Sequence, residues 1–433
     1  MAVVRLSGGA VAGALAGLIG PLPPPRKAVL RALRDPETAE VLDRGLVLWF
    51  PAPNSFTGED LAELHVHGGR AVLDGLFRAL GRFPDLRMAE AGEFTRRAVA
   101  NGKLDLTAAE GIGDLIAAET AAQRRQALQQ ADGALATVYQ DWSNRLLRIL
   151  AHMEAWLDFP DEDLPDSLVP ETRAALARLG EELRRHLADA RQGERVRNGL
   201  QVAIIGAPNA GKSTLLNALA QRDVAIVTAQ AGTTRDVLDV HLDLGGHAVT
   251  LADTAGLRET DDEIEREGMR RALQRAAGAD LILHLAEAGT AWDPVHFESE
   301  TAAAGGPEVI RVRTKIDLSP DGDPQDIVSS SVIGLSVRSG EGMAVLLDRL
   351  TGAAEDLTRH GGLAPPTRWR HRESLGDAVA ALAQAEDGLA QGLPFELVGE
   401  DLRMAVRALG RITGTVDVED LLDVIFRDFC IGK

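Results

Sequence analysis

The stretch LQVAIIGAPNAGKSTLLNAL, Leu200–Leu219, decides the fold of the central part of this 433-residue chain. An apolar run suited to a buried strand leads into Gly206-x-x-x-x-Gly211-Lys212-Ser213, and a helical pattern follows. This is the phosphate-loop pattern in the strand–loop–helix setting that it requires. Its glycines let backbone N–H groups surround a β-phosphate, and the helix N-terminus favours an anion. We therefore expect Lys212 to neutralise the β- and γ-phosphates of a nucleotide and Ser213 to bind Mg²⁺. The predicted nucleotide contacts of this loop are Asn209, Ala210, Gly211, Lys212, Ser213 and Thr214.

Two further motifs follow in the order that a GTPase requires. AGTTRD, Ala231–Asp236, offers Thr234 as a second Mg²⁺ ligand on a loop that can order around a γ-phosphate. DTAG follows an apolar strand, so that Asp253 can hold Mg²⁺ through water and the Gly256 N–H can sense the γ-phosphate. The other nucleotide contacts predicted in these loops are Thr228, Gly232, Thr233, Arg235, Asp236, Thr254 and Ala255.

The motif TKID, Thr314–Asp317, predicts guanine as the base. The Asp317 carboxylate can accept two hydrogen bonds from guanine, whereas adenine presents no such pair of donors. Lys315 can lie along the base, and the later stretch LSVRSGEG brings backbone N–H groups of Ser336, Val337 and Arg338 towards guanine O6. Together these motifs resemble the translation-factor-like GTPases, in which the base-reading motif usually begins with asparagine. Since threonine reaches less far, we expect weaker base binding with the guanine preference retained.

The means of hydrolysis is less directly encoded. Leu257 stands where Ras-like enzymes carry a water-orienting glutamine, and Arg235 and Arg258 are candidate arginine fingers. Asn209, with oxygens from the loop 228–233, can instead hold a monovalent cation that neutralises charge on the transferring phosphate. The alternative interpretation of Asn209 is a turn-forming residue. The acidic run 258–268 is either a solvated start of a helix or the source of a carboxylate that positions the attacking water.

Composition narrows the setting of this domain. The net charge of −19 makes the chain a poor binder of polyanions unless a local basic patch or a partner supplies the positive field. The single cysteine excludes an internal disulfide and fits a reducing cytoplasm. No apolar run reaches the length of a membrane span. Gly8–Gly20 is a run of small residues that we interpret as a packed helix rather than a signal peptide.

The pattern on either side predicts the domain organisation. Residues 1–102 mix strand-like alternation with helical spacing and predict an α+β N-terminal domain. Residues 103–198 and 355–433 have helical composition and spacing, whereas 199–354 alternates short apolar strands with helices. We therefore expect an all-α helical domain interrupted by an inserted α/β P-loop (Ras-like) GTPase domain.

Motifs outside the GTPase domain are specific to a family. PNSFTGEDLAELHVHGG (53–69), GEFTRRAVANGKLDLTAAEGIGDLI (92–116) and the terminal FCIGK resemble the MnmE (TrmE) family of tRNA-modification GTPases over nearly the whole chain. The resemblance implies a cytoplasmic homodimer whose N-terminal domain binds 5-formyl- or methylene-tetrahydrofolate. It also implies a larger complex with the FAD protein MnmG, which would provide most of the tRNA contact. Together they would add a (carboxymethyl)aminomethyl group to carbon 5 of the wobble uridine, with potassium-stimulated GTP hydrolysis.

The resemblance also implies roles for individual residues. Folate contacts would be Arg5, Glu63, Lys103 and Lys433; potassium ligands Asn209, Thr228, the Gln230 carbonyl and Thr233; magnesium ligands Ser213 and Thr234. Glu265 would position the attacking water through a second water, with Arg258 nearby. Family members usually carry an extra strand ahead of the Arg5 motif. We therefore expect either that the start codon of this sequence is assigned too late or that its folate site lacks one edge.

The tail FRDFCIGK, 426–433, carries the lone Cys430. If the tail reaches the folate pocket, Cys430 is either a nucleophile towards the uridine or the one-carbon unit, or a small buried hydrophobe. His65 and His67 share one face of a predicted strand, which favours a structural role. Two other functions remain as alternatives: a ribosome-assembly or regulatory GTPase, and a folate-binding scaffold with a vestigial GTPase domain. The acidic composition disfavours the first and the complete phosphate motifs disfavour the second.

Overall fold

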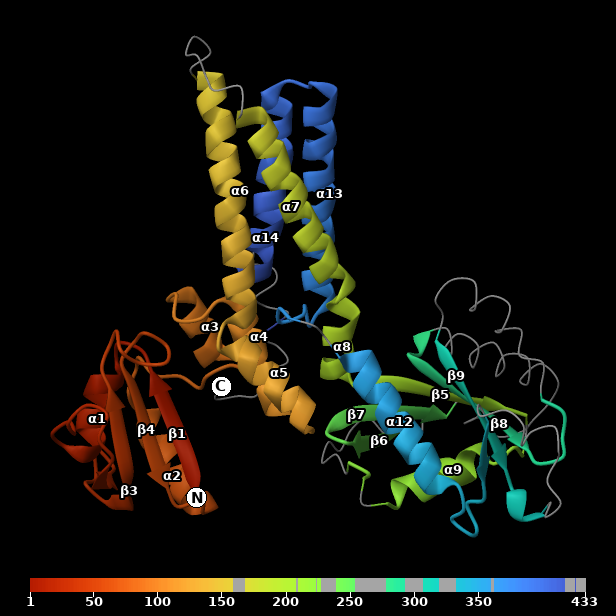
Figure 1. Cartoon of the computed structure of the whole chain (residues 1–433). Helices are drawn as coiled ribbons and strands as arrows, with labels where there is room; N and C mark the ends of the chain where they lie inside the picture. Colours follow the sequence, from red (N-terminus) through yellow and green to blue (C-terminus); the bar gives the residue numbers. More distant parts are fainter. Residues whose placement is uncertain are drawn as a thin grey trace, which may run out of the picture. The chain divides into compact units, whose positions relative to one another are not determined.

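The computed structural model describes residues 1–158, 168–207, 209–222, 224–226, 239–253, 278–292, 307–318, 332–359, 362–416 and 425. Contacts divide the chain into two compact units (Figure 1). The first consists of Met1–Gly113, Gln130–Leu176 and Ala380–Lys433, and the second of Asp114–Gln129 and Ala177–Val379. The predicted domain boundaries are finer than this division and stay predictions.

The N-terminal part of the first unit is an antiparallel sheet with two helices. Its strand order is β1-β4-β3-β2, and alternate residues of the strands pack against α1 and α2 in one core. The small-residue run forms α1, whose Val11, Leu15 and Leu18 are buried, as expected for a packed helix. The α+β prediction for this part is therefore confirmed. The elements are β1 Ala2–Ser7, α1 Val11–Ile19, β2 Val29–Arg34, β3 Val41–Phe50, β4 Leu61–Val66, α2 Arg70–Leu80 and α3 Glu93–Ala100.

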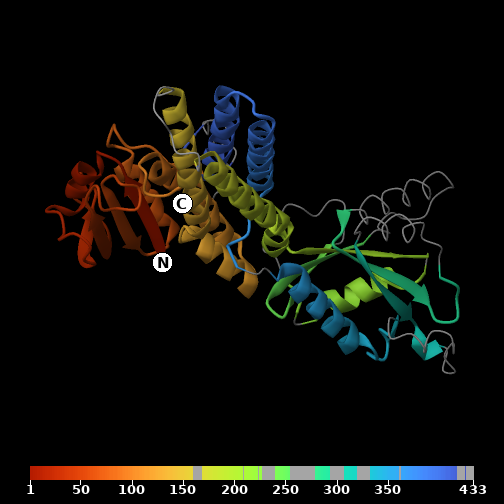
Figure 2. The same ribbon diagram turned by 45° about the horizontal axis from the view of Figure 1, so that its top comes forward.

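Long helices make up the rest of the first unit. α6 and α14 lie far apart in the sequence and pack side by side, yellow and blue in both views (Figure 1, Figure 2). Tyr139, Leu146 and Met153 on α6 and Leu402 and Leu409 on α14 are fully buried. Among the described residues, no helix has the length and apolar composition to cross a membrane. The helices outside the GTPase domain that follow α3 are α4 Leu106–Ala117, α5 Ala121–Ala131, α6 Ala134–Asp158, α7 Leu168–Ala188, α8 Ala190–Asn198, α13 Trp369–Gln391 and α14 Phe395–Thr413.

The second unit contains the predicted α/β domain. Its six strands have the order β10-β9-β8-β5-β7-β6, all parallel except β6, which pairs antiparallel with β7. Ligands bind at the carboxyl ends of the strands in such sheets, and the phosphate loop follows the end of β5. Sequence analysis did not predict β6 or β10. The elements are β5 Leu200–Gly206, α9 Lys212–Ala220, β6 Asp239–Leu244, β7 His247–Asp253, β8 Leu281–Glu287, β9 Glu308–Thr314, the 3₁₀ turn η1 Ile316–Leu318, β10 Val332–Leu335 and α12 Met343–Thr358.

Candidate functional site

The phosphate loop has the backbone conformation that its glycines permit. Gly206 has φ +149°, and a Cβ atom there would overlap with the carbonyl oxygen of Leu285 on β8. Gly211 precedes α9 with φ +91° in the left-handed region. Asn209 has φ +65°, a conformation that asparagine tolerates better than most residues, so its turn-forming role has a structural basis. Its role as a potassium ligand stays a prediction because Thr228, Gln230 and Thr233 lie outside the described residues.

Lys212 is held by the loop that it follows. Its Nζ donates to the carbonyl oxygens of Gly206 at 2.7 Å and Ala207 at 2.9 Å, and the residue is buried. Neutral carbonyls bind an ammonium group less strongly than charged phosphate oxygens, so a nucleotide can replace them. Ser213 and Thr214 are exposed on the first turn of α9. The Ser213 hydroxyl is an oxygen ligand of the kind that Mg²⁺ prefers, which fits the predicted metal site.

The TKID motif adjoins the phosphate loop. The Thr314 hydroxyl is buried and donates to the carbonyl oxygen of Ala210 at 2.7 Å. This side chain therefore connects the end of β9 to the phosphate loop, a role that we did not predict from the sequence. Lys315 has φ +56° and its Nζ lies 2.6 Å from Oε2 of Glu287 at the end of β8. Asp317 is exposed on η1.

The loop after β10 lies beside this motif because Leu335 is in register with Thr314. Ser336 is fully buried, its N–H donates to the Glu341 carbonyl at 3.0 Å, and its hydroxyl accepts from the Ser339 N–H at 3.2 Å. These bonds form the turn that carries Val337 and Arg338. The structure thus brings the predicted phosphate-binding and base-binding segments to one edge of the sheet.

Most other predicted residues of the GTPase site, and the tail residues Cys430 and Lys433, lie outside the described part of the chain. Asp253 ends β7, but its side chain is outside the described part. The roles assigned to the remaining ones stay predictions. Outside the described residues are Thr228, Gln230, Gly232, Thr233, Thr234, Arg235, Asp236, Thr254, Ala255, Gly256, Arg258, Glu265, Cys430 and Lys433.

Two predicted folate contacts form an ion pair on the N-terminal sheet. Arg5 on β1 and Glu63 on β4 are in register, and Arg5 Nη2 donates to Glu63 Oε1 at 2.8 Å. The Arg5 guanidinium also lies over the ring of Phe94 on α3, 5.6 Å from its centre. His65 Nε2 lies 3.3 Å from the other Glu63 oxygen, and His67 Nδ1 lies 2.9 Å from Asp43. Both histidines therefore contact carboxylates.

Lys103, the third predicted folate contact, is placed by the end of α3. Its N–H donates to the Ala98 carbonyl at 2.8 Å and the Gly102 N–H to the Val99 carbonyl at 3.0 Å. This pair of bonds is a Schellman motif, and it requires the left-handed φ of +65° that Gly102 adopts. The sequence NGK is thus a helix end that fixes the backbone of Lys103 and leaves its side chain exposed.

The fold and the phosphate loop define a P-loop GTPase whose α/β domain interrupts a helical domain and follows an α+β domain. Comparison with protein families identifies its relatives: residues 1–103 match the N-terminus of the GTP-binding protein TrmE, and residues 106–430 match the MnmE helical domain. The chain belongs to the MnmE family of tRNA modification GTPases, and it is a GTP hydrolase.

Relatives of full length support this assignment. A tRNA modification GTPase MnmE of Parvibaculum lavamentivorans is 54% identical over 100% of this chain and 97% of that protein. Proteins of the same name from Rhodospirillum rubrum and Paramagnetospirillum magneticum are 52% and 53% identical, each over 100% of this chain and 96% of the relative. The similarity thus includes all three predicted domains.

Proposed function

We propose that this protein uses GTP hydrolysis to drive a folate-dependent modification of carbon 5 of the wobble uridine in certain tRNAs, together with the FAD protein MnmG. The group added would be an aminomethyl or carboxymethylaminomethyl group. The observation that carries the proposal is the presence in one chain of the Lys212 phosphate loop and the Arg5–Glu63 pair, the latter within the region that matches the TrmE N-terminus.

Hydrolysis would rest on groups around the phosphate loop. Lys212 would leave its two carbonyl partners and bind the β- and γ-phosphates. Ser213 and Thr234 would hold Mg²⁺, which supplies positive charge against the phosphates when bound. Asn209, with Thr228, the Gln230 carbonyl and Thr233, would hold K⁺. Glu265 would position the attacking water, with Arg258 nearby.

The one-carbon chemistry would take place at the N-terminal domain. Arg5, Glu63 and Lys103 would bind the tetrahydrofolate, and Lys433 would join them if the tail reaches the pocket. Glu63 can accept hydrogen bonds from a pterin, and the cationic side chains can pair with the carboxylates of the folate glutamate. Cys430 would then be close to the one-carbon carrier, either as a nucleophile or as a packed hydrophobe.

A contact within the second unit supports coupling of the nucleotide state to the helices. The turn between β6 and β7 accepts the Ala122 N–H of α5 at the Gly246 carbonyl, 2.9 Å away, and His247 Nδ1 lies 3.0 Å from Thr358 Oγ1 of α12. β6 follows the predicted switch loop and β7 leads to DTAG, so a change in either loop can shift these helices. We infer a cycle in which the two G domains of a homodimer close on GTP and K⁺, and hydrolysis reopens them.

The partners and location follow from the same proposal. The protein would act in the cytoplasm as a homodimer in a heterotetramer or larger complex with MnmG. Its net charge of −19 disfavours direct binding of a polyanion, so the tRNA would be held largely by MnmG.

The test is the wobble uridine itself. Total tRNA from a strain that lacks this protein is digested and its nucleosides are quantified by mass spectrometry. We expect the modification to vanish in the deletion strain and to return with the wild-type gene or with Lys27→Ala, an exposed control, but not with Lys212→Ala. An unchanged wobble uridine in the deletion strain would reject the proposal in favour of a ribosome-assembly or regulatory GTPase. Rescue by Cys430→Ser would show that the thiol is not a nucleophile and that Cys430 has a packing role.

A further inference from the structure

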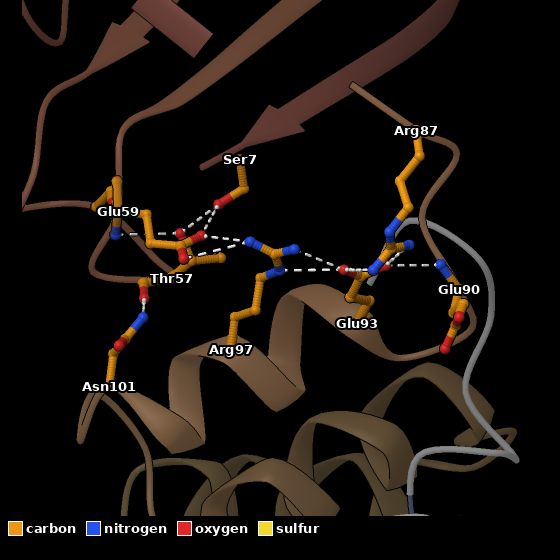
Figure 3. Close-up of polar contacts among 9 residues, drawn as sticks. Ser7, Thr57, Glu59, Arg87, Glu90, Glu93, Arg97 and Asn101 are labelled. Atoms are coloured by element: carbon orange, nitrogen blue, oxygen red, sulfur yellow. Dashed lines mark hydrogen bonds and ion pairs between the residues drawn. The ribbon is translucent and has the colours of Figure 1, made fainter. Parts of the chain in front are cut away.

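A continuous set of polar contacts joins three segments of the N-terminal domain (Figure 3). The segments are the end of β1, the loop that precedes β4, and α3. None of the residues in these contacts is among the predicted folate ligands. We call the set the Arg97 network; its members are Ser7, Thr57, Glu59, Glu93, Arg97 and Asn101.

Arg97 lies at the centre of this network, between two carboxylates (Figure 3). Its Nη1 donates to both oxygens of Glu59, at 3.2 and 3.0 Å, and its Nη2 and Nε donate to Glu93 at 2.8 and 3.1 Å. Glu59 belongs to the loop before β4, whereas Glu93 is in the first turn of α3. Arg97 therefore fixes α3 against that loop, and its guanidinium is engaged by protein carboxylates rather than directed to a ligand.

The network returns to the end of α3 by a second route. Ser7 Oγ donates to Glu59 at 3.0 Å and lies 2.6 Å from the hydroxyl of Thr57, which is fully buried. The Thr57 carbonyl accepts from the Asn101 side-chain amide at 2.7 Å. Asn101 is the residue at the C-cap of α3. The loop thus contacts the last turn of α3 at Arg97 and its C-cap at Asn101, and Arg97 also pairs with Glu93 in the first turn.

The network adjoins two described residues of the predicted folate site, Arg5 and Lys103. Arg5 and Ser7 are two residues apart on β1, so their side chains point to the same face of the sheet. Phe94, over which the Arg5 guanidinium lies, is on the same helix as Arg97. Lys103 is fixed at the end of that helix, and a Cβ atom on Gly58 of the loop would lie 3.2 Å from its Cε.

We propose that Arg97 is a positioning residue for folate binding, because it sets the place of α3 and hence of Phe94 and Lys103 relative to Arg5 and Glu63. This inference rests on the proposed function, since it concerns the same site. It assigns to Arg97 an effect through other residues, with no contact to the folate.

Isothermal titration calorimetry with 5-formyltetrahydrofolate on the full-length protein is the first measurement. We expect Arg97→Gln to weaken binding at least tenfold and Arg97→Lys to recover part of the loss. Arg87→Gln is the matched control, because Arg87 also pairs with Glu93 but is 61% exposed and does not contact Glu59 in the described structure. We expect the control to bind within about twofold of wild type.

Hydrogen exchange separates positioning from a direct contact. The amides of residues 101–103 should exchange faster in Arg97→Gln than in wild type or Arg87→Gln, while melting of the N-terminal sheet stays unchanged. In the double variant Glu59→Gln/Arg97→Gln the affinity should stay close to that of Arg97→Gln alone, since the Glu59–Arg97 pair is already lost and a glutamine amide can still accept from Ser7 Oγ. If Arg97→Gln fails to fold, Asn101→Ala is measured in its place. This change removes one exposed side chain of the network and should weaken folate binding several-fold.

The outcomes are distinct. Binding by Arg97→Gln equal to wild type would overturn the inference and leave the folate site intact, as would weaker binding with unchanged exchange at residues 101–103. Where the Gln variant fails to fold, unchanged affinity in Asn101→Ala would overturn it. Absence of 5-formyltetrahydrofolate binding by the wild-type protein would instead reject the folate proposal itself, and this inference with it.

Discussion

The phosphate loop and the Arg97 network hold their cations in different ways. Lys212 donates to carbonyls five and six residues earlier in the chain. Arg97 pairs with Glu93, four residues away on the same helix, and also with Glu59, 38 residues away. The loop is therefore shaped by local backbone geometry and glycine. In the network, the Arg97–Glu59 pair exists only after α3 has packed against the loop before β4, whereas the Arg97–Glu93 pair lies within α3. Steric changes should damage the first most, and changes of charge or pH the second.

The largest effect is expected at Gly206. Gly206→Ala would place a methyl group against the Leu285 carbonyl at a φ of +149° that alanine rarely adopts. We expect GTP affinity to fall more than 100-fold, measured with a fluorescent GTP analogue. Gly352→Ala is the control: a Cβ atom there meets nothing within 4 Å on α12, so affinity should not change and stability should rise by up to about 1 kcal/mol. Wild-type affinity in Gly206→Ala would show that the loop is not sterically determined.

A buried histidine gives the second unit its own response to acid. Burial, and then the charge of His371, lowers the pKa of His186 from its ordinary value of 6.5 to about 4. Below pH 6.5, His186 binds a proton in the unfolded chain but stays neutral in the folded chain. The free energy of unfolding therefore falls as pH drops from 6.5 to about 4. The full loss is about 3 kcal/mol. Urea unfolding at pH 8, 6 and 4.5 should show it, and His186→Gln should reduce this dependence; an equal slope in that variant would contradict the assignment.

A variant of Thr314 tests whether the shape of the phosphate loop depends only on residues close in the sequence, as the contacts of Lys212 suggest, or also on β9. Thr314→Val keeps the shape but removes the hydroxyl that donates to the Ala210 carbonyl. The buried carbonyl then loses a partner, at a cost of about 1–2 kcal/mol, and we expect GTP affinity to fall roughly tenfold. Thr314→Ser retains the hydroxyl and should bind within about twofold of wild type. Equal affinity in Thr314→Val would show that the loop keeps its shape without support from β9.

The same contrast explains what the sequence could predict. The α+β, helical and α/β parts were predicted because alternation, helical spacing and the phosphate-loop pattern are local signals. The link from Thr314 to Ala210, the Lys315–Glu287 pair and the Arg97 network were not, because each joins residues whose proximity depends on strand register or helix packing. GEFTRRAVANGK pointed to the family without assigning a role to Arg97. Only NGK, with glycine after a helix, carried a local signal for the placement of Lys103.

The smallest expected effect concerns Glu93 and sharpens the contrast in pH response. Burial alone would raise the pKa of Glu93, but the Glu90 N–H and the guanidinium groups of Arg97 and Arg87 hold it below its ordinary value. Its stabilisation is therefore present above the ordinary carboxyl pKa and is lost as pH falls through the lowered one. At pH 7, Glu93→Gln should cost about 1 kcal/mol of unfolding free energy, and the difference should shrink as pH falls below the ordinary carboxyl pKa. Glu37→Gln is the control, because Glu37 is 69% exposed and its pair with Arg82 should contribute under about 0.5 kcal/mol. The loss of stability that involves Glu93 thus lies at a lower pH than the loss that involves His186. Two separate acid transitions in unfolding would support charge pairing in the Arg97 network. A single transition near pH 5 would count against it.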